Sequence, residues 1–231
     1  QKERCTTMPD NTSPEAWPLP ELTRARRAIV VVDVVESVRL MQEDEAGFIE
    51  RWRRFVREVR TEVLPKLGGR LVKSLGDGML LTFAQVREAV AAAKTLHALA
   101  QGAGNGSASS AATVLRIGVH IADVTIDDLD VYGTGVNLAA RLGGLGRGGQ
   151  TILSVDAKEA LIEGLDVETK DLGECYVKHL SQPIRAFLLA DAAPTAPLDR
   201  PATLLPHLVV MPIDGVGGMG ATDVRGVAHE A

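Results

Sequence analysis

One run of six residues constrains the fold more than any other feature of the sequence. Residues 28–33 read Ala-Ile-Val-Val-Val-Asp, an apolar and largely β-branched stretch without polar alternation. Such a run is typical of a strand covered on both faces, so the chain has to build a sheet with other layers packed on it. The run ends on a carboxylate, Asp33, which must face solvent, a partner or a metal.

The segments that follow predict an α+β domain around that strand. Apolar residues at helical spacing, from Phe48 to Val63, predict a helix that reaches about residue 66. Residues 70–75 and 79–83 predict two strands joined across Asp77-Gly78, a favoured hairpin turn. An Ala-rich helix over 85–101 and a strand over 114–124 complete the order β-α-β-β-α-β. This is the ferredoxin-like split pattern, an antiparallel sheet with helices packed on it.

Further elements extend this core as a C-terminal αβ segment. The sequence predicts a short helix over 135–142, a strand over 151–154, a helix opened by a capping box of Asp156 and Glu159, and strands over 165–176 and 184–189. We expect residues 1–26, polar and Pro-containing, to be an N-terminal linker or arm. We expect residues 27–190 to form one domain and residues 191–231 to be a linker with the truncated start of a further region.

Composition and charge exclude several classes of protein. Hydrophobic residues make up 45% of the 231 residues, which excludes collagen and global disorder. The net charge of −5 argues against binding nucleic acid through bulk charge. Cys5 and Cys175 are too few for a disulfide framework and fit a reducing, cytoplasmic location. No apolar run approaches the roughly 20 residues that span a bilayer, so we expect no membrane segment in this chain.

Two aspartates are candidate metal ligands. Asp33 closes the first strand and Asp77 lies in the hairpin turn, and in the split pattern these strands can be neighbours. Two carboxylates at one edge of a sheet suit Mg²⁺, which takes oxygen ligands and shares them with substrate phosphates. The alternative is simpler, because Asp-Gly is good turn chemistry and Asp33 can face solvent.

Three other side chains are candidates for binding an anionic or polar ligand. Lys73 alternates with Leu71 and Leu75, so we expect it to share their face; alternatively its stem covers the core while its ammonium reaches water. Asn137 and Arg141 are four residues apart on one face of the short helix. Arginine is suited to holding a phosphate, although an ordinary pair with a surface carboxylate is the alternative.

These residues together resemble the catalytic domain of class III adenylyl and guanylyl cyclases, especially the bacterial adenylate cyclase type. The pattern consists of Asp33, then Lys73-x-x-x-Asp77, then Asp130 followed by Asn137 and Arg141. The similarity runs from about residue 27 to residue 189. The stretches VVDVVESVRLM and YGTGVNLAARL are those that are most similar to the bacterial form.

The resemblance implies a role for each matching residue. Asp33 and Asp77 would hold two Mg²⁺ or Mn²⁺ ions per site. Arg141 would stabilise charge on the α-phosphate, and Asn137 would position the ribose and this arginine. Lys178 matches a lysine that contacts the terminal phosphates in the family.

The same resemblance implies a substrate and an assembly. Lys73 and Asp130 match the residues that read the base, and a donor beside an acceptor fits adenine and mismatches guanine. Guanylyl-specific relatives resemble this pattern with Glu and Cys, which are absent here. The implied function is an adenylate cyclase that converts ATP to 3′,5′-cyclic AMP and pyrophosphate by a two-metal mechanism at a homodimer interface.

One departure keeps a second function open. After the first metal aspartate the family usually has Gly, an aromatic residue and then Ser or Thr, whereas here Glu36-Ser37-Val38 follow. A glutamate there could repel the triphosphate or point away from it. The alternative is therefore a catalytically weak or degenerate cyclase-fold module that senses nucleotide or serves in regulatory dimerisation. A diguanylate cyclase is disfavoured, because its Gly-Gly-Asp/Glu-Glu-Phe signature is missing.

Overall fold

A curled sheet organises the part of the chain that the structure describes. The structure is a computed structural model, and it describes residues 22–74, 76–102, 113–127, 130–161, 167–177, 180 and 182–190. Eight strands of these residues form the sheet: β1 Thr23–Val34, β2 Arg70–Ser74, β3 Gly78–Phe83, β4 Leu115–Ile126, β5 Val131–Tyr132, β6 Thr151–Ser154, β7 Thr169–Cys175 and β8 Ile184–Leu189. Their order is β2-β3-β1-β4-β6-β8-β7, with β5 paired to β4, and every pair is antiparallel except β4–β6.

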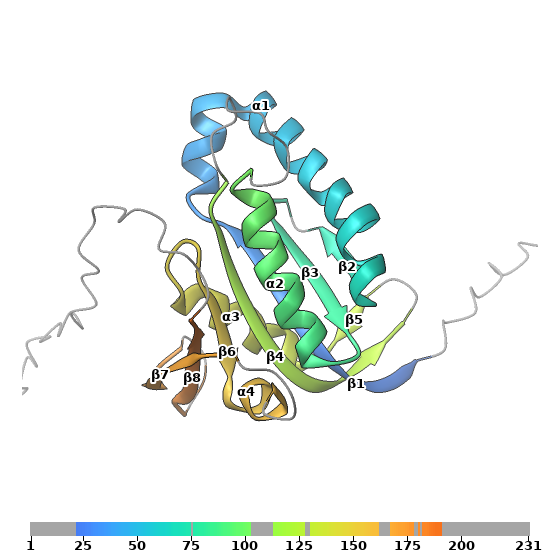
Figure 1. The fold of residues 1–231 in the computed structure, drawn as a ribbon, viewed down its shortest axis with the longest axis vertical. Coiled ribbons are helices and arrows are strands. Elements are labelled where there is room, and N and C mark those ends of the chain that lie inside the picture. Colours follow the sequence, from blue (N-terminus) through green and yellow to red (C-terminus); the bar gives the residue numbers. More distant parts are fainter. Residues whose placement is uncertain are drawn as a thin grey trace, which may run out of the picture. The chain divides into compact units, whose positions relative to one another are not determined.

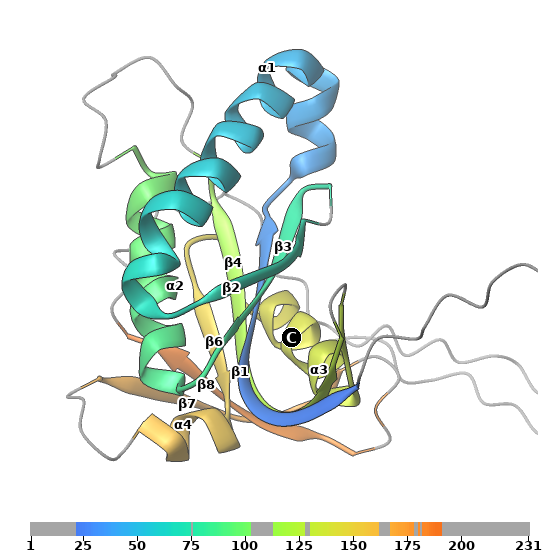
Figure 2. The ribbon, with the colours of Figure 1, turned by 90° about the vertical axis from the view of Figure 1, so that its right-hand side faces the viewer.

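Helices cover both faces of this sheet (Figures 1 and 2). The helices are α1 Ser37–Glu58, α2 Val86–Ala100, α3 Thr134–Leu145 and α4 Val155–Leu161, and a π-helical turn, Val59–Val63, and a 3₁₀ turn, Pro65–Leu67, follow α1. In Figure 2, α1 and α2 lie on one side of the central strands and α3 lies on the other. The predicted α+β class, with helices packed on a mostly antiparallel sheet, is confirmed.

The two faces bury different amounts of apolar surface. On the α1/α2 face, large side chains such as Phe48, Trp52 and Phe83 join one extensive core with the helices. The α3 face has smaller clusters, in which Ile29, Leu80 and Ala139 are representative. The β1 run thus has both faces covered, as its continuous apolar sequence predicts.

A glycine in β4 lets α3 approach the sheet closely. A Cβ atom added to Gly118 would lie 1.9 Å from the carbonyl oxygen of Ala139. No side chain larger than hydrogen can occupy that position without moving α3. Because α3 carries Asn137 and Arg141, this contact determines how far the backbone of those two residues lies from the sheet.

Three boundaries differ from the sequence-based expectation. β1 begins at Thr23, before the apolar run, because its polar residues pair with the far end of β4 in a partly exposed ribbon. The predicted capping box at Asp156 is wrong: α4 starts at Val155, and the Ser154 hydroxyl accepts the bond from the Ala157 amide at 3.1 Å. β7 begins at Thr169 rather than residue 165, and residues 162–166 lie outside the described part.

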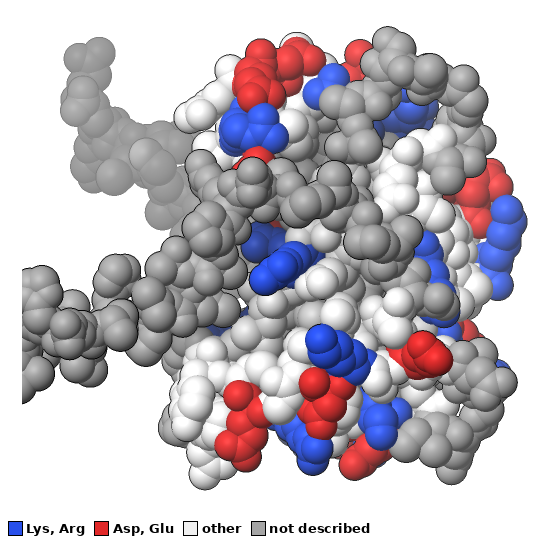
Figure 3. All heavy atoms as spheres, turned by 60° about the vertical axis from the view of Figure 1, so that its left-hand side comes forward, with Lys and Arg blue, Asp and Glu red and all other residues white. Residues whose placement is uncertain are grey.

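Other expectations concern residues that the structure does not describe. Residues 1–21 and 191–231 are among these, so the predicted arm is described only from residue 22 and the predicted further region not at all. Within the described ranges, no helix combines the length and the apolarity needed to cross a membrane. On the face shown in Figure 3, the described acidic and basic side chains are interspersed.

Candidate active site

The sheet brings Asp33 and Asp77 together, as predicted from the hairpin. Asp33 lies opposite Gly78 in the β1–β3 register, and Gly78 directly follows Asp77 in the chain. The amide of Val34 donates a hydrogen bond of 3.1 Å to the Asp77 carbonyl, which ties the two segments at this level. The end of a buried strand and the tip of a hairpin therefore meet at one edge, with a carboxylate from each.

Each of these carboxylates has a partner from another element. Asp77 accepts a hydrogen bond from the hydroxyl of Ser37, the first residue of α1. Asp33 forms an ion pair with the Nη2 atom of Arg116, its cross-strand neighbour in β4. The Asp33 side chain is 39% exposed, so this edge of the sheet is open to solvent.

The donor set of this edge fits a hard divalent cation. Asp33 and Asp77 offer carboxylate oxygens only, the ligand type that Mg²⁺ and Mn²⁺ prefer. Among the described residues there is no group of three or more His, Cys, Asp or Glu side chains that could hold a metal. Two carboxylates leave most coordination positions to water and substrate oxygens, which suits Mg²⁺ at a phosphate site.

Lys73 and Asp130 form a second charged pair. The Lys73 Nζ atom lies 2.5 Å from Oδ2 of Asp130, although the two residues are 57 positions apart. The other oxygen of Asp130 accepts from the Val131 amide at 2.8 Å, so the carboxylate is held from both sides. The hydrogen bond from Lys73 lowers the pKa of Asp130, which keeps this carboxylate ionised and an acceptor at neutral pH.

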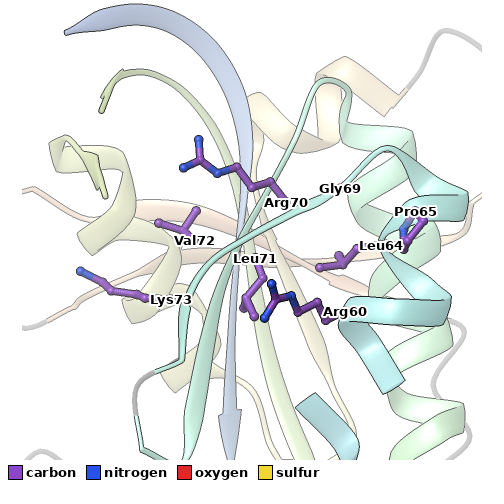
Figure 4. Close-up of a pocket in the computed structure, with 8 residues that line it drawn as sticks. All are labelled: Arg60, Leu64, Pro65, Gly69, Arg70, Leu71, Val72 and Lys73. Atoms are coloured by element: carbon purple, nitrogen blue, oxygen red, sulfur yellow. The ribbon is translucent and has the colours of Figure 1, made fainter. Parts of the chain in front are cut away.

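The direction predicted for Lys73 is wrong, and the cause is a β-bulge. Leu71 pairs with Leu81, whereas Lys73 pairs with Leu80, so the register shifts by one residue between them. Directly opposed residues share a face, and Leu80 belongs to the α3 face while Leu81 belongs to the α1/α2 face. The bulge thus turns Lys73 to the α3 face (Figure 4), away from Leu71.

Asn137 and Arg141 lie on α3, as their spacing predicts. Asn137 is exposed and Arg141 is half-buried. In the described part of the chain neither side chain has a hydrogen bond or an ion pair, so the ordinary surface pair considered for Arg141 is not observed. Lys178, the remaining predicted phosphate ligand, lies outside the described residues.

One chain does not join all the predicted site residues. No hydrogen bond or ion pair within the described ranges links Asp33 or Asp77 to Lys73, Asp130 or the two residues of α3. Asp33 is the last residue but one of β1, while Asp130 precedes β5, which pairs with the part of β4 that lies against the beginning of β1. A pocket of about 440 Å³ beside β2 (Figure 4) shares only Lys73 with the predicted set.

Three residues near Asp33 and Asp77 were missed or only partly interpreted from the sequence. Arg116 interrupts the apolar run of β4, which was the available signal, and Ser37 begins α1. Glu36 has φ 56°, the left-handed region that favours glycine, and it stands where the family resemblance leads us to expect Gly. Its carboxylate lies 2.7 Å from Nε of Arg39, so its charge is paired within the first turn of α1.

Comparisons with known proteins identify the family of this chain. Residues 27–191 match the family described as the adenylate and guanylate cyclase catalytic domain. A protein of Rhizobium meliloti named "Putative adenylate cyclase 3" is 30% identical over 210 residues, which are 85% of this chain. The match spans only 35% of that relative's length.

Solved structures give the same result. The adenylate/guanylate cyclase/hydrolase from Silicibacter pomeroyi has a TM-score of 0.65 at 28% identity, covering 73% of this chain and 98% of the other. The adenylyl cyclase CyaB from P. aeruginosa has a TM-score of 0.62 at 21% identity, covering 75% and 97%, which shows a shared fold. The chain therefore belongs to the adenylate and guanylate cyclase catalytic domain family, the class III nucleotide cyclases.

Proposed function

We propose that this domain is an adenylate cyclase that converts ATP to 3′,5′-cyclic AMP and pyrophosphate in a homodimer. The observation that carries the choice of ATP is the pair of Lys73 and Asp130, whose charged atoms are 2.5 Å apart. Family membership supports the reaction class, and this pair supports the base.

The pair is a donor beside an acceptor. Lys73 can only donate and ionised Asp130 can only accept. Adenine offers an acceptor at N1 next to a donor at its 6-amino group, so Lys73 serves N1 and Asp130 serves the amino group. Guanine reverses both groups on that edge, which would leave two polar groups of the site unpaired.

The remaining residues take roles along the triphosphate. Asp33 and Asp77 hold divalent cations, which when bound lower the pKa of the ribose 3′-hydroxyl and neutralise phosphate charge. Asn137 orients the ribose, and Arg141 stabilises the charge that grows on the α-phosphate as the 3′-oxygen attacks. Lys178 takes the terminal phosphates. Pyrophosphate leaves as the cyclic phosphodiester closes.

The separation of the two groups supports a dimer with composite sites. One protomer contributes Asp33 and Asp77, while its partner contributes the base readers with Asn137 and Arg141. Each chain contains both groups once, so a two-fold dimer has two equivalent sites.

The alternative, a degenerate module for nucleotide sensing or regulatory dimerisation, depended on Glu36. Arg39 pairs with this carboxylate at 2.7 Å and with Glu43 at 2.6 Å, so one guanidinium offsets part of the charge that would repel a triphosphate. The proposed metal, base and phosphate residues are otherwise all present in the sequence. We therefore favour the active cyclase.

The direct test is purified protein incubated with ATP or GTP and with Mg²⁺ or Mn²⁺, with the product identified by mass. We expect cyclic AMP from ATP, and at most about a hundredth of that rate from GTP, because a mismatched base edge leaves polar groups unpaired. No cyclic nucleotide with any combination would favour the sensing module instead.

A paired substitution tests the base readers. Lys73→Glu with Asp130→Cys introduces the residue types of guanylyl-specific relatives and should lower ATP turnover about a hundredfold. GTP turnover should fall much less or rise. An ATP-over-GTP preference that stays unchanged in this double variant would refute the assignment of these two residues.

A further inference from the structure

We propose that Arg116 is a built-in counter-ion of the cation site. Its guanidinium pairs with the Asp33 carboxylate, and a divalent cation that binds Asp33 must displace it. The inference rests on the proposed function, since it takes Asp33 as a metal ligand. In this inference Arg116 controls the affinity for metal, and the two aspartates differ in how strongly they bind it.

The sheet register places Arg116 where it can compete with a cation. Asp33 lies between two cross-strand neighbours, Gly78 on β3 and Arg116 on β4. Gly78 has no side chain, so the β3 side of the carboxylate is open toward Asp77. Arg116 supplies the positive charge on the other side. An ion between the two aspartates would thus meet a guanidinium already on one of its ligands.

The contact is made in a way that allows displacement. Arg116 contacts Oδ2 of Asp33 through Nη2 alone, and the structure gives no second nitrogen on the other oxygen. Its Nε atom is buried without a hydrogen-bond partner among the described residues. A bidentate fork would be stronger than this single contact. The pair is also about one-third exposed on both sides, so solvent screens it.

Asp77 is held differently. Its partner is the neutral hydroxyl of Ser37, which can turn to donate elsewhere without leaving a charge unpaired. A cation that binds Asp77 therefore displaces a weak donor, whereas one that binds Asp33 displaces a full charge. Asp33 should accordingly be the weaker of the two ligands in the free chain.

Direct titration of Mn²⁺ without nucleotide tests this inference. The free Mn²⁺ ion is followed by electron paramagnetic resonance in wild type and in Arg116→Gln. We expect the variant to bind Mn²⁺ about fivefold more tightly, as removal of a partly exposed competing charge implies. Affinity equal to or weaker than that of wild type would overturn the inference.

Two control variants separate the possible causes. Arg185→Gln removes an equal charge from a guanidinium that pairs with Asp171 at 2.5 Å on the β7–β8 hairpin, and it should leave Mn²⁺ affinity unchanged. Asp33→Asn should weaken Mn²⁺ binding at least tenfold if Asp33 is a ligand. If Asp33→Asn binds Mn²⁺ like wild type, the proposed metal site itself fails; if only Arg116→Gln gives no gain, the counter-ion role alone fails.

A second readout covers the case in which Arg116→Gln does not fold. Arg116→Met keeps the stem within the sheet and removes the charge. Thermal unfolding with and without Mg²⁺ should show a larger upward shift of Tm in this variant than in wild type, since tighter ligand binding stabilises the folded state more. A shift equal to or smaller than that of wild type would contradict the counter-ion role.

Discussion

The buried hydrogen bond of α2 and the ion pairs on the α3 face hold their polar side chains in opposite ways. On the α1/α2 face, His97 of α2 is buried and shares a hydrogen bond of 3.0 Å with the Thr151 hydroxyl, with no charged partner. On the α3 face, Asp33 pairs with Arg116 and Lys73 pairs with Asp130, and all four are partly exposed. The buried contact is uncharged and belongs to the packed interior, whereas the two ion pairs keep their charges where a ligand can reach them.

Solvation explains this division. Burial lowers the pKa of His97 to about 4, because a charged imidazole would lose its hydration in that core. On the other face α3 covers the middle of the sheet at Gly118, and Asp33 lies two residues farther along β1 than the partner of Gly118. Charges at that edge keep part of their water. Variants of the partly exposed charged residues should therefore remove activity with little loss of stability. Variants of the packed regions should lower stability with less effect on activity.

The largest expected effect is the loss of the proposed metal ligand Asp77. Asp77→Ala should lower cyclic AMP formation by a factor of about a thousand or more, since the cations it is proposed to hold would stabilise the reacting phosphates by several kcal/mol. The unfolding free energy should change by less than about 1 kcal/mol, because a partly exposed turn residue is replaced. A variant that keeps near-normal turnover, measured beside an unchanged circular dichroism spectrum, would remove Asp77 from the metal site.

Mixing two inactive variants sharpens this prediction. Asp77→Ala and Arg141→Ala should each be inactive alone, yet in a mixed dimer one site collects both changes and the other collects neither. With free exchange about half of the dimers are mixed, so activity should return to about a quarter of wild type. Failure to recover, despite exchange demonstrated with tagged subunits, would place the whole site within one chain.

The sequence predicts the positions of the candidate site residues well where neighbouring residues determine the local structure. The meeting of Asp33 and Asp77 follows from an apolar strand and an Asp-Gly turn, both of which are read from adjacent residues. The helix that carries Asn137 and Arg141 follows from its spacing. The link between Lys73 and Asp130 came from the family resemblance, and the structure confirms only that these side chains meet.

What the sequence could not predict depends on distant partners. The bulge that turns Lys73 to the α3 face depends on how β2 pairs with β3, and simple alternation misses it. The Arg116–Asp33 pair joins residues 83 positions apart. The α4 cap went to Ser154 instead of Asp156 because the helix starts directly where β6 ends. In the first two cases tertiary pairing, rather than local preference, selects the contact, whereas the cap is a local contact whose position depends on where β6 ends.

The next effect concerns the packing of α3. In Gly118→Ala the new methyl group would collide with the Ala139 carbonyl, a backbone atom that cannot rotate away. We expect the free energy of unfolding to fall by about 3 kcal/mol, the upper range for an overpacked site. Chemical denaturation measures this, and Gly144→Ala, on the same helix with open space around its Cβ position, is the matched control. Equal stability of both variants would contradict the close approach of α3.

A pH titration tests the neutral histidine of the other face. The folded-state pKa of His97, about 4, lies below its ordinary value near 6.5, so the folded chain binds this proton less readily. The stability it contributes is fully present above pH 6.5 and is lost as pH falls toward 4, by about 3 kcal/mol in total. His97→Gln, which keeps a polar partner for Thr151, should flatten that part of the stability curve. Identical pH curves for variant and wild type would show that His97 is not held neutral.

The smallest effect is expected at Glu36, where β1 passes into α1 between the two faces. Its left-handed backbone costs a non-glycine residue about 1 kcal/mol. Glu36→Gly removes that cost and also removes the exposed pair with Arg39, which contributes only a few tenths of a kcal/mol. We therefore expect a net gain in unfolding free energy of about 0.5 kcal/mol.

Arg39→Gln separates the backbone contribution from the Glu36 effect, because it leaves the backbone as it is while it breaks the pair with Glu36 and a second exposed pair with Glu43. If Glu36→Gly is the less stable of these two variants, the left-handed strain is not what limits this turn. Cyclic AMP formation gives an independent measurement. Since Arg39 already pairs with the Glu36 carboxylate, Glu36→Gly should change the turnover of ATP by less than about threefold, a difference below 1 kcal/mol in the barrier. A much larger rise would mean that Glu36 repels the triphosphate despite its partner.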